Sequence, residues 1–335
     1  MAKVLVTGAT GFIGSALTRK LLDRGDEVHI LARQKNPPYT NLEDLPVRVH
    51  HGDIQNAVSL RGAMKGLDYV YHAAAVYQFY PWWKRKNLAI HKINIQGTRN
   101  VVEAARWENI RKIVYTSSII TIGRKTDGSF SNENTSYDPA QSNSNYARSK
   151  LEAERFVLEE TKRGLPAVVV NPGITLGERD HKPTPSGEII IKFLNRVYPC
   201  TFETTWCVAG ADDVADGHIA AMEKGKIGER YILCNREHYS MAQIFRMLEK
   251  ITGVRAPRFS LPLPLIRAFA YADEGSARWI KHQPLLSTEG LRFCSSRLKC
   301  NNAKAVRELG YANSPIETAL EKAVQWYRDH GYVEK

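Results

Sequence analysis

The side chains with the clearest chemical potential in this sequence are Tyr146 and Lys150, which stand four positions apart in Tyr-Ala-Arg-Ser-Lys. Residues at i and i+4 share one face of a helix, so the phenol and the ammonium would point to the same side. A tyrosine with a pKa near ~10 is a weak acid–base at neutral pH, and a neighbouring ammonium lowers that pKa. The pair would suit proton exchange with a carbonyl or an alcohol. An ordinary helix face is the alternative that the spacing alone leaves open.

A second chemical feature is the glycine-rich turn at residues 7–14, where Gly8, Gly11 and Gly14 have the spacing G-x-x-G-x-x-G. The turn stands between an expected strand and an expected helix. Gly8 would permit the tight turn, Gly11 would let the backbone approach a pyrophosphate, and Gly14 would let helix and strand pack closely. The helix N-terminus would add free N–H groups and a positive dipole for the anion. The turn therefore predicts a dinucleotide site.

The choice of nucleotide depends on the end of the second expected strand. Enzymes that choose NAD place an acid there, ~20 residues after the turn, to bind the ribose 2′-hydroxyl. Here Arg33 stands 19 residues after Gly14, and Lys35 is close by. A guanidinium suits a 2′-phosphate, so the sequence favours NADP(H) as cofactor, with NAD(H) as the alternative. A solvated loop charge is the other interpretation of Arg33.

These groups can act together only if regular elements hold them, and the first half of the chain alternates strand and helix patterns. Such alternation predicts βαβ units, and so a parallel sheet with helices on both faces. The crossover rule then predicts an α/β fold of the doubly wound Rossmann type. We expect strands at 3–8, 27–33, 47–53, 69–75, 112–118 and 167–171, and helices at 12–24, 57–65, 93–107 and 145–163.

The pattern changes after Pro172, to a loop over 175–186 and then mostly helices. We expect a Rossmann domain at 1–173, to which later segments can return, and a smaller, mostly helical substrate lobe at 174–335. The segment 261–280 is apolar but carries four charged residues. A packed helix is the favoured interpretation, and contact with a membrane surface or an apolar ligand is the alternative. The lobe's expected helices are 188–197, 213–224, 241–252 and 316–330, with a short strand at 230–234.

The composition is that of an ordinary globular protein, with 335 residues, 43% hydrophobic and 24% charged, so disordered and fibrous classes are excluded. A net charge of +12 predicts an acidic partner. A phosphorylated cofactor or an anionic surface explains this charge as well as nucleic acid does. No nucleic-acid partner is predicted, because the basic cluster at 84–86 is short and no binding motif accompanies it. No apolar run approaches the ~20 residues of a transmembrane segment. The start lacks a secretory signal pattern, so we expect a cytoplasmic protein.

The five cysteines are odd in number and form no C-x-x-C pair. Without an export signal, a disulfide framework is not expected, and neither is a structural zinc site. We interpret the cysteines as small buried hydrophobes and expect no bound metal.

In their order along nearly the whole chain, the motifs resemble the extended short-chain dehydrogenase/reductase superfamily, also called NAD-dependent epimerase/dehydratases. The segments that carry this resemblance are 7–14, 52–53, 72–75, 94–98, 115–118, 146–150 and 171–173. The segments 171–177, 182–187 and 225–233 resemble its dihydroflavonol-4-reductase-like branch, and within it the proteins called hopanoid-associated sugar epimerases.

The resemblance implies roles for the matching positions. Tyr146 would be the acid/base, Lys150 would bind the nicotinamide ribose and lower the pKa of Tyr146, and Asn94 would support Lys150. Ser118 would hydrogen-bond the substrate oxygen, with Ser117 as the alternative. The resemblance also implies a homodimer through two helices, one of them 145–163. The expected cofactor contacts are Gly8, Thr10, Gly11, Phe12, Ile13, Gly14, Arg33, Lys35, Asp53, Ile54, Ala73, Ala74, Ala75, Thr116, Ser117, Tyr146, Lys150, Pro172 and Gly173.

Three functions stay open. A reductase of a ketone or aldehyde, using NADP(H), is favoured by Arg33 and by the reductase-like segments. A nucleotide-sugar epimerase or dehydratase with tightly bound NAD(P) is the second, although Ile119 and Ile120 follow Ser118 where dehydratases carry acids. A non-catalytic NADP-binding sensor is the third. The aromatic segment 77–83 would wall an aromatic or polyprenoid-like small-molecule substrate, or pack under a surface loop.

Overall fold

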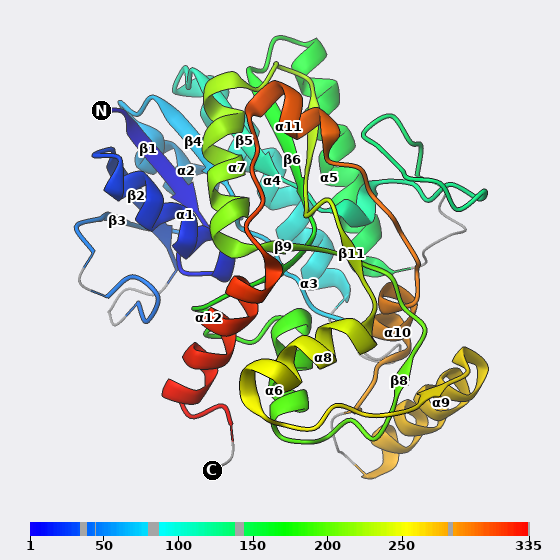
Figure 1. The fold of residues 1–335 in the computed structure, drawn as a ribbon. Coiled ribbons are helices and arrows are strands. Elements are labelled where there is room, and N and C mark those ends of the chain that lie inside the picture. Colours follow the sequence, from blue (N-terminus) through cyan, green and yellow to red (C-terminus); the bar gives the residue numbers. More distant parts are fainter. Residues whose placement is uncertain (34–38, 44, 80–86, 138–143, 281–283, 334–335) are drawn as a thin grey trace.

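A parallel sheet of seven strands forms the centre of the molecule, in the order β10-β6-β5-β4-β1-β2-β3 (Figure 1). The computed structural model describes the chain apart from residues 34–38, 44, 80–86, 138–143, 281–283 and 334–335. The strand order reverses between β1 and β4, and ligands bind at such a switch point, beyond the carboxyl ends of the strands. The strands are β1 (Lys3–Thr7), β2 (Glu27–Ala32), β3 (Arg48–His51), β4 (Tyr69–His72), β5 (Lys112–Thr116), β6 (Ala167–Pro172) and β10 (Arg230–Leu233).

Helices cover both faces of this sheet. Successive strand residues point to opposite faces, so Val4 and Val6 pack in one apolar layer and Leu5 packs in the other. The doubly wound Rossmann-type prediction is therefore confirmed. On the first face lie α1 (Phe12–Asp23), α7 (Ala211–Lys224) and α11 (Ala303–Leu309), and on the second lie α2 (Ala57–Met64), α4 (Gly97–Trp107) and α5 (Asn145–Lys162).

The later segments form a second, mostly helical body below the sheet in Figure 1. Its apolar core includes the tilted rings of Phe193 and Phe245, with centroids 4.8 Å apart, and the buried Trp326. The mostly helical character expected for this part of the chain is confirmed. Its elements are α6 (Pro185–Leu194), α8 (Met241–Thr252), α9 (Leu263–Ile280), α10 (Thr288–Cys294) and α12 (Ile316–Asp329), with short strands β7 (Ile174–Leu176), β8 (Thr201–Phe202), β9 (Trp206–Gly210), β11 (His238–Tyr239) and β12 (Ser260–Leu261).

Three segments differ from the sequence prediction. The strand expected in the second lobe is β10, which pairs parallel with β6 at the edge of the main sheet. Together with α7, β10 is the later segment that returns to the Rossmann domain, as the prediction allowed. The expected helix at 93–107 is wrong at its start, where a π-helix, η1 (Lys92–Gln96), lies between α3 (Asn87–His91) and α4. The expected loop at 175–186 is shortened by β7 and by α6, which Thr184 caps by accepting a hydrogen bond from the Gly187 N–H. The domain boundary at 173 stays a prediction.

Candidate active site

The carboxyl ends of β1, β4, β5 and β6 open onto one cavity of about 560 Å³. Asn94 does not line it, and Lys35 lies outside the described residues. The cavity is large enough for an extended ligand, and it unites residues that are far apart in the sequence. The sequence-predicted site residues on its wall are Gly8, Thr10, Gly11, Phe12, Ile13, Gly14, Arg33, Asp53, Ile54, Ala73, Ala74, Ala75, Thr116, Ser117, Ser118, Tyr146, Lys150, Pro172 and Gly173.

The glycine turn forms one end of this cavity, and it fits a diphosphate. Gly8 has a φ of 77°, and a Cβ there would lie 2.6 Å from the Ala74 backbone nitrogen. A Cβ on Gly14 would lie 2.1 Å from the Gly8 carbonyl oxygen. The first turn of α1 has no side-chain cap, so its N–H groups remain available for an anion. A larger side chain at Gly8 would push the turn away from the segment after β4, and one at Gly14 would push α1 away from the turn.

The end of the cavity where adenosine is expected contains Arg33, whose side chain is exposed. Asp53 is fixed beside it, because its Oδ1 accepts from the Gln55 N–H at 2.8 Å. Asn41, which no sequence motif marks, donates from Nδ2 to the carbonyls of Thr10 (3.2 Å) and Arg179 (2.9 Å). It therefore joins the glycine turn to the second lobe.

Tyr146 lies at the other end, in the first turn of α5. Ser144 caps this helix, its hydroxyl accepting from the Ala147 N–H at 3.2 Å. The lowered pKa expected for Tyr146 is wrong, because burial raises the pKa of the phenol and a hydrogen bond with Ser118 only opposes that rise. The phenol is thus held in its protonated form beside Ser118.

Ser117 and Ser118 occupy different environments. Ser118 begins the short helix η2 (Ile119–Thr121) and accepts from the Ile120 N–H at 3.3 Å. Its hydroxyl is also the one bonded to Tyr146. The Ser117 hydroxyl is buried on the cavity wall without a hydrogen-bond partner. This geometry favours Ser118 as the partner of Tyr146 and leaves Ser117 free to bind a ligand.

Lys150 lies one turn after Tyr146 and is 3% exposed. Its ammonium donates to the Thr116 carbonyl oxygen at 2.8 Å. Burial lowers the pKa of Lys150 to about 8, and the charge of Glu154 opposes that shift. The ammonium is therefore close to its titration range at neutral pH.

Glu154, one turn further along α5, fixes the base of the site. Its Oε2 accepts from Thr121 Oγ1 (2.8 Å) and Asn171 Nδ2 (2.6 Å), and its Oε1 accepts from Arg230 Nη1 (2.9 Å). This buried network ties α5 to η2, β6 and β10. The position of Glu154, four residues after Lys150, was the one sequence signal that could have marked it. The hydrogen-bond partners of Glu154 lie in distant segments, so no local pattern reveals them.

Asn94 is hydrogen-bonded to Val76 and to Ser149, the residue before Lys150. Its Nδ2 donates to Ser149 Oγ at 2.9 Å and to the Val76 carbonyl at 3.1 Å, and its Oδ1 accepts from the Val76 N–H at 2.8 Å. The side chain therefore clamps the segment after β4 to α5. A supporting role toward Lys150 stays a prediction.

A buried histidine fixes the π-helix that carries Asn94. Thr98 Oγ1 donates to the Asn94 carbonyl at 2.6 Å, so it accepts from His72 Nε2 at 3.1 Å. His72 Nδ1 then accepts from Thr7 Oγ1 at 2.7 Å. Burial, helped by the charge of Lys150, lowers the pKa of His72 to about 3. The ring is neutral and links β1, β4 and η1 rather than moving protons.

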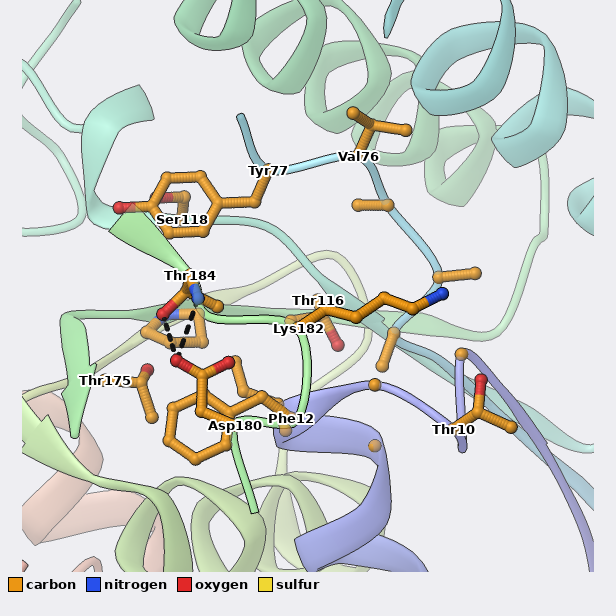
Figure 2. Close-up of a pocket in the computed structure, with 18 of the residues that line it drawn as sticks. Thr10, Phe12, Val76, Tyr77, Thr116, Ser118, Thr175, Asp180, Lys182 and Thr184 are labelled. Carbon is orange, nitrogen blue, oxygen red and sulfur yellow. Dashed lines mark hydrogen bonds between the residues drawn. The ribbon is translucent and has the colours of Figure 1, made fainter. Parts of the chain in front are cut away.

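The cavity wall beyond Tyr146 is apolar. The rings of Tyr77 and Tyr146 have centroids 4.8 Å apart, and Phe79 lies 5.3 Å from Phe293 of α10. Figure 2 shows Tyr77 above Ser118 on this wall. A second cavity of about 50 Å³ adjoins it, lined by Ile119, Ile120, Ile122, Arg124, Tyr137, Ile174, Thr205, Trp206, Cys207, Phe293, Ser296 and Leu298.

Tyr77 and Phe79 are the part of the predicted aromatic segment that the structure describes; Tyr80, Trp82 and Trp83 lie outside the described residues. Phe293 was missed by sequence reasoning. It comes from a short helix late in the chain, and no motif marks it.

Two further wall residues, Asp180 and Lys182, come from the segment before α6. Figure 2 shows Lys182 extended through the pocket toward the side where Thr10 lies. Asp180 is 2% exposed, and its Oδ2 accepts from the Thr184 N–H (2.8 Å), Thr184 Oγ1 (2.7 Å) and Tyr327 Oη (3.0 Å). Asp180 therefore ties this segment to α12.

Burial raises the pKa of Asp180 to about 6, although its hydrogen bonds lower it. The protonated Asp180 side chain makes its full contribution to the free energy of unfolding below the unfolded-state pKa near ~4. This contribution is lost as pH rises through about 6. Asp180→Asn keeps an acceptor oxygen without the charge. We expect the variant to unfold at higher urea than the parent at pH 7.5, by roughly 2–3 kcal/mol at most, and at equal urea near pH 4. A variant that is less stable at pH 7.5 would contradict this assignment.

No helix in the described part of the chain is long and apolar enough to cross a membrane. Cys207, Cys234 and Cys300 are buried and unpaired, as expected for small apolar side chains, and the other two cysteines are half-buried.

Comparison with known proteins gives a consistent result. The family model described as "NAD dependent epimerase/dehydratase family" matches residues 4–234. A "Putative dihydroflavonol 4-reductase" from Synechocystis sp. is 37% identical over 98% of this chain and 95% of its own length. "Sterol demethylase protein B" from Methylococcus capsulatus is 30% identical over 98% of this chain and 99% of its own length. The crystal structure of gox2253 superposes with a TM-score of 0.85 at 36% identity, and each chain covers 100% of the other.

Proposed function

The chain belongs to the NAD dependent epimerase/dehydratase family and is an oxidoreductase, and we propose that it reduces an apolar ketone or aldehyde to an alcohol with NADPH. When bound, the nicotinamide supplies the hydride. The relatives named as reductases support this direction, and the narrower grouping with hopanoid-associated sugar epimerases stays a prediction.

The residues around Tyr146 account for the proton. Because its pKa is raised, the phenol stays protonated across neutral pH and can donate to the carbonyl oxygen as negative charge develops there. Ser118 orients the same oxygen, and the Lys150 ammonium stabilises the tyrosine after its proton has left. The Ser117 hydroxyl, buried and without a partner, is available to the cofactor.

The observation that carries the substrate class is the apolar wall beyond Tyr146. Tyr77 and Phe293 line this end of the cavity, Phe79 packs against Phe293, and Ile120 packs against Tyr146. A nucleotide sugar would bring a diphosphate that needs cationic partners. Within the described part of the chain, the arginines and lysines lining the two cavities are Arg33, Lys150, Lys182 and Arg124. Lys182 extends toward the side where Thr10 lies, and Arg124 donates to the Ser296 carbonyl at 3.0 Å. An uncharged carbonyl compound fits this wall better.

The NADP preference rests on Arg33, on the wall of the adenosine end. An exposed guanidinium suits a 2′-phosphate, and this supports the preference for NADPH. A homodimer through two helices, one of them α5, is part of the same proposal, because the family resemblance implies it.

Stoichiometry tests the proposed reaction. Incubation with NADPH and aromatic or isoprenoid ketones should consume one NADPH for each alcohol formed. Incubation with nucleotide sugars should produce no isomer. An isomerised or dehydrated sugar formed without net NADPH loss would instead support the epimerase/dehydratase alternative, and absence of turnover despite NADPH binding would support a sensor.

The lowered pKa of Lys150 predicts an alkaline limit for activity. Since the ammonium is the active form and its pKa is about 8, kcat/KM for NADPH should fall by about tenfold per pH unit above that value. Lys150→Met should lower kcat/KM at pH 7 and remove the fall of kcat/KM at alkaline pH. A parent profile that is flat up to pH 9.5 would contradict the role of Lys150.

A further inference from the structure

Helix α9 exposes an apolar stripe that has no partner within the described part of the chain. Ile266, Ala270, Glu274 and Ala277 are buried against the second lobe. On another side, Leu265, Phe269 and Trp279 are 56%, 50% and 83% exposed. Positions i, i+4 and i+14 fall on one face of a helix, so these three side chains share one side of α9, with Phe269 and Trp279 about 15 Å apart along its axis. They are called the α9 stripe.

The acidic and basic side chains of α9 have different environments. Asp273 Oδ2 accepts from the Leu285 N–H at 2.7 Å, and Glu274 Oε2 accepts from the Thr288 N–H at 3.0 Å. Both acids are therefore committed to backbone groups of the following segment. Among the described side chains of α9, the exposed ones are apolar or aromatic except for Arg267.

A second cation borders the stripe. The exposed Arg292 of α10 donates to the Tyr271 hydroxyl at 3.2 Å, and Tyr271 is itself 56% exposed. The outer surface thus combines large apolar groups, an amphipathic aromatic ring and arginines. This is the composition of helices that lie in the headgroup region of a bilayer. The net charge of +12 adds attraction to anionic headgroups.

We propose that the α9 stripe docks this protein on the surface of a bilayer that contains anionic lipid. A stable protein partner would need ~20–30 residues on each side of the interface, far more than the stripe offers. Figure 1 shows α9 at the outer edge of the second lobe, well away from the α5 helix expected at a dimer interface. Docking is therefore compatible with that dimer.

The docking surface adjoins the proposed substrate end of the cavity. Helix α10 packs on α9 and carries Phe293, which lines both cavities. An apolar compound dissolved in the bilayer would therefore meet the protein near the apolar end of its site. Docking itself does not require the proposed reaction, and the two can fail separately.

Vesicle binding tests the proposal with the full chain. The protein is pelleted with vesicles of pure phosphatidylcholine and with an equimolar mixture of phosphatidylcholine and phosphatidylglycerol. The stripe variant is Leu265→Ser/Phe269→Ser/Trp279→Ser. The matched control is Val58→Ser/Trp107→Ser/Ile227→Ser, which removes one tryptophan and two aliphatic side chains that are 79%, 66% and 57% exposed elsewhere. NADPH affinity and the unfolding midpoint show whether each variant is folded.

We expect the parent and the control to bind mixed vesicles alike, and the stripe variant to bind at least 30-fold more weakly with unchanged NADPH affinity. Arg267→Glu should weaken binding to mixed vesicles by about fivefold or more and leave binding to pure phosphatidylcholine unchanged. Equal pelleting of the stripe and control variants would overturn the proposal. So would a parent that ignores vesicles but forms a dimer that the stripe variant dissociates, because a second copy would then cover the stripe.

Discussion

Replacing Tyr146 with phenylalanine should lower kcat by about 10²–10⁴-fold, the range typical of losing a general acid, while NADPH affinity stays nearly intact. The ring would still fill its place against Tyr77 and Ile120, so the fold should not change. The hydroxyl near Ser118 would be missing, and the carbonyl oxygen would have no proton donor. Steady-state kinetics and NADPH titration of the purified variant provide the measurement.

Tyr115→Phe is the matched control for this substitution. Tyr115 is as buried as Tyr146 and lies in β5 with its ring 5.2 Å from the Lys150 ammonium, but it does not line the cavity. The control should keep near-normal activity. Full activity in Tyr146→Phe, or an equal loss in both variants, would show that Tyr146 is not the acid.

Arg33→Asp should shift the cofactor preference from NADPH toward NADH by roughly 10–100-fold. Loss of a charge-assisted contact costs about 1.5–3 kcal/mol, and the new carboxylate would repel the 2′-phosphate while accepting from a 2′-hydroxyl. The ratio of the Kd values for NADPH and NADH measures the effect. Because Arg33 is exposed, the substitution should leave the unfolding midpoint unchanged.

Arg33→Gln separates the two contributions to this shift. The neutral variant should lose NADPH affinity without gaining NADH affinity, and so fall between the parent and Arg33→Asp. A Kd ratio that is the same in all three proteins would exclude a 2′-phosphate contact at this position.

The parts of the site that follow from local rules could be predicted from the sequence. The glycine turn has one geometry that joins a strand to a helix, so Gly8 and Gly14 mark it without further context. The four-residue spacing of Tyr146 and Lys150 places both on one face of α5 wherever that helix packs. Strand and helix alternation likewise predicts the doubly wound sheet, because connections between parallel strands have a fixed hand.

The parts that depend on tertiary packing could not be predicted. Phe293 reaches the cavity from α10, and Arg230 completes the Glu154 network from the edge strand β10. Neither residue has a local pattern that marks it. The π-helix before α4 arises where Asn94 must meet both Val76 and Ser149, a demand set by contacts rather than by helix propensity.

The nucleotide that the purified protein carries shows whether it is a reductase that exchanges NADPH in every turnover. The purified protein is denatured, any released nicotinamide nucleotide is identified, and the nucleotide-free form is titrated with NADPH and NADH. We expect little retained nucleotide and reversible binding that favours NADPH. Protein that arrives loaded with NAD⁺ and does not release it without denaturation would contradict the account and indicate hydride recycling within one site, as in an epimerase.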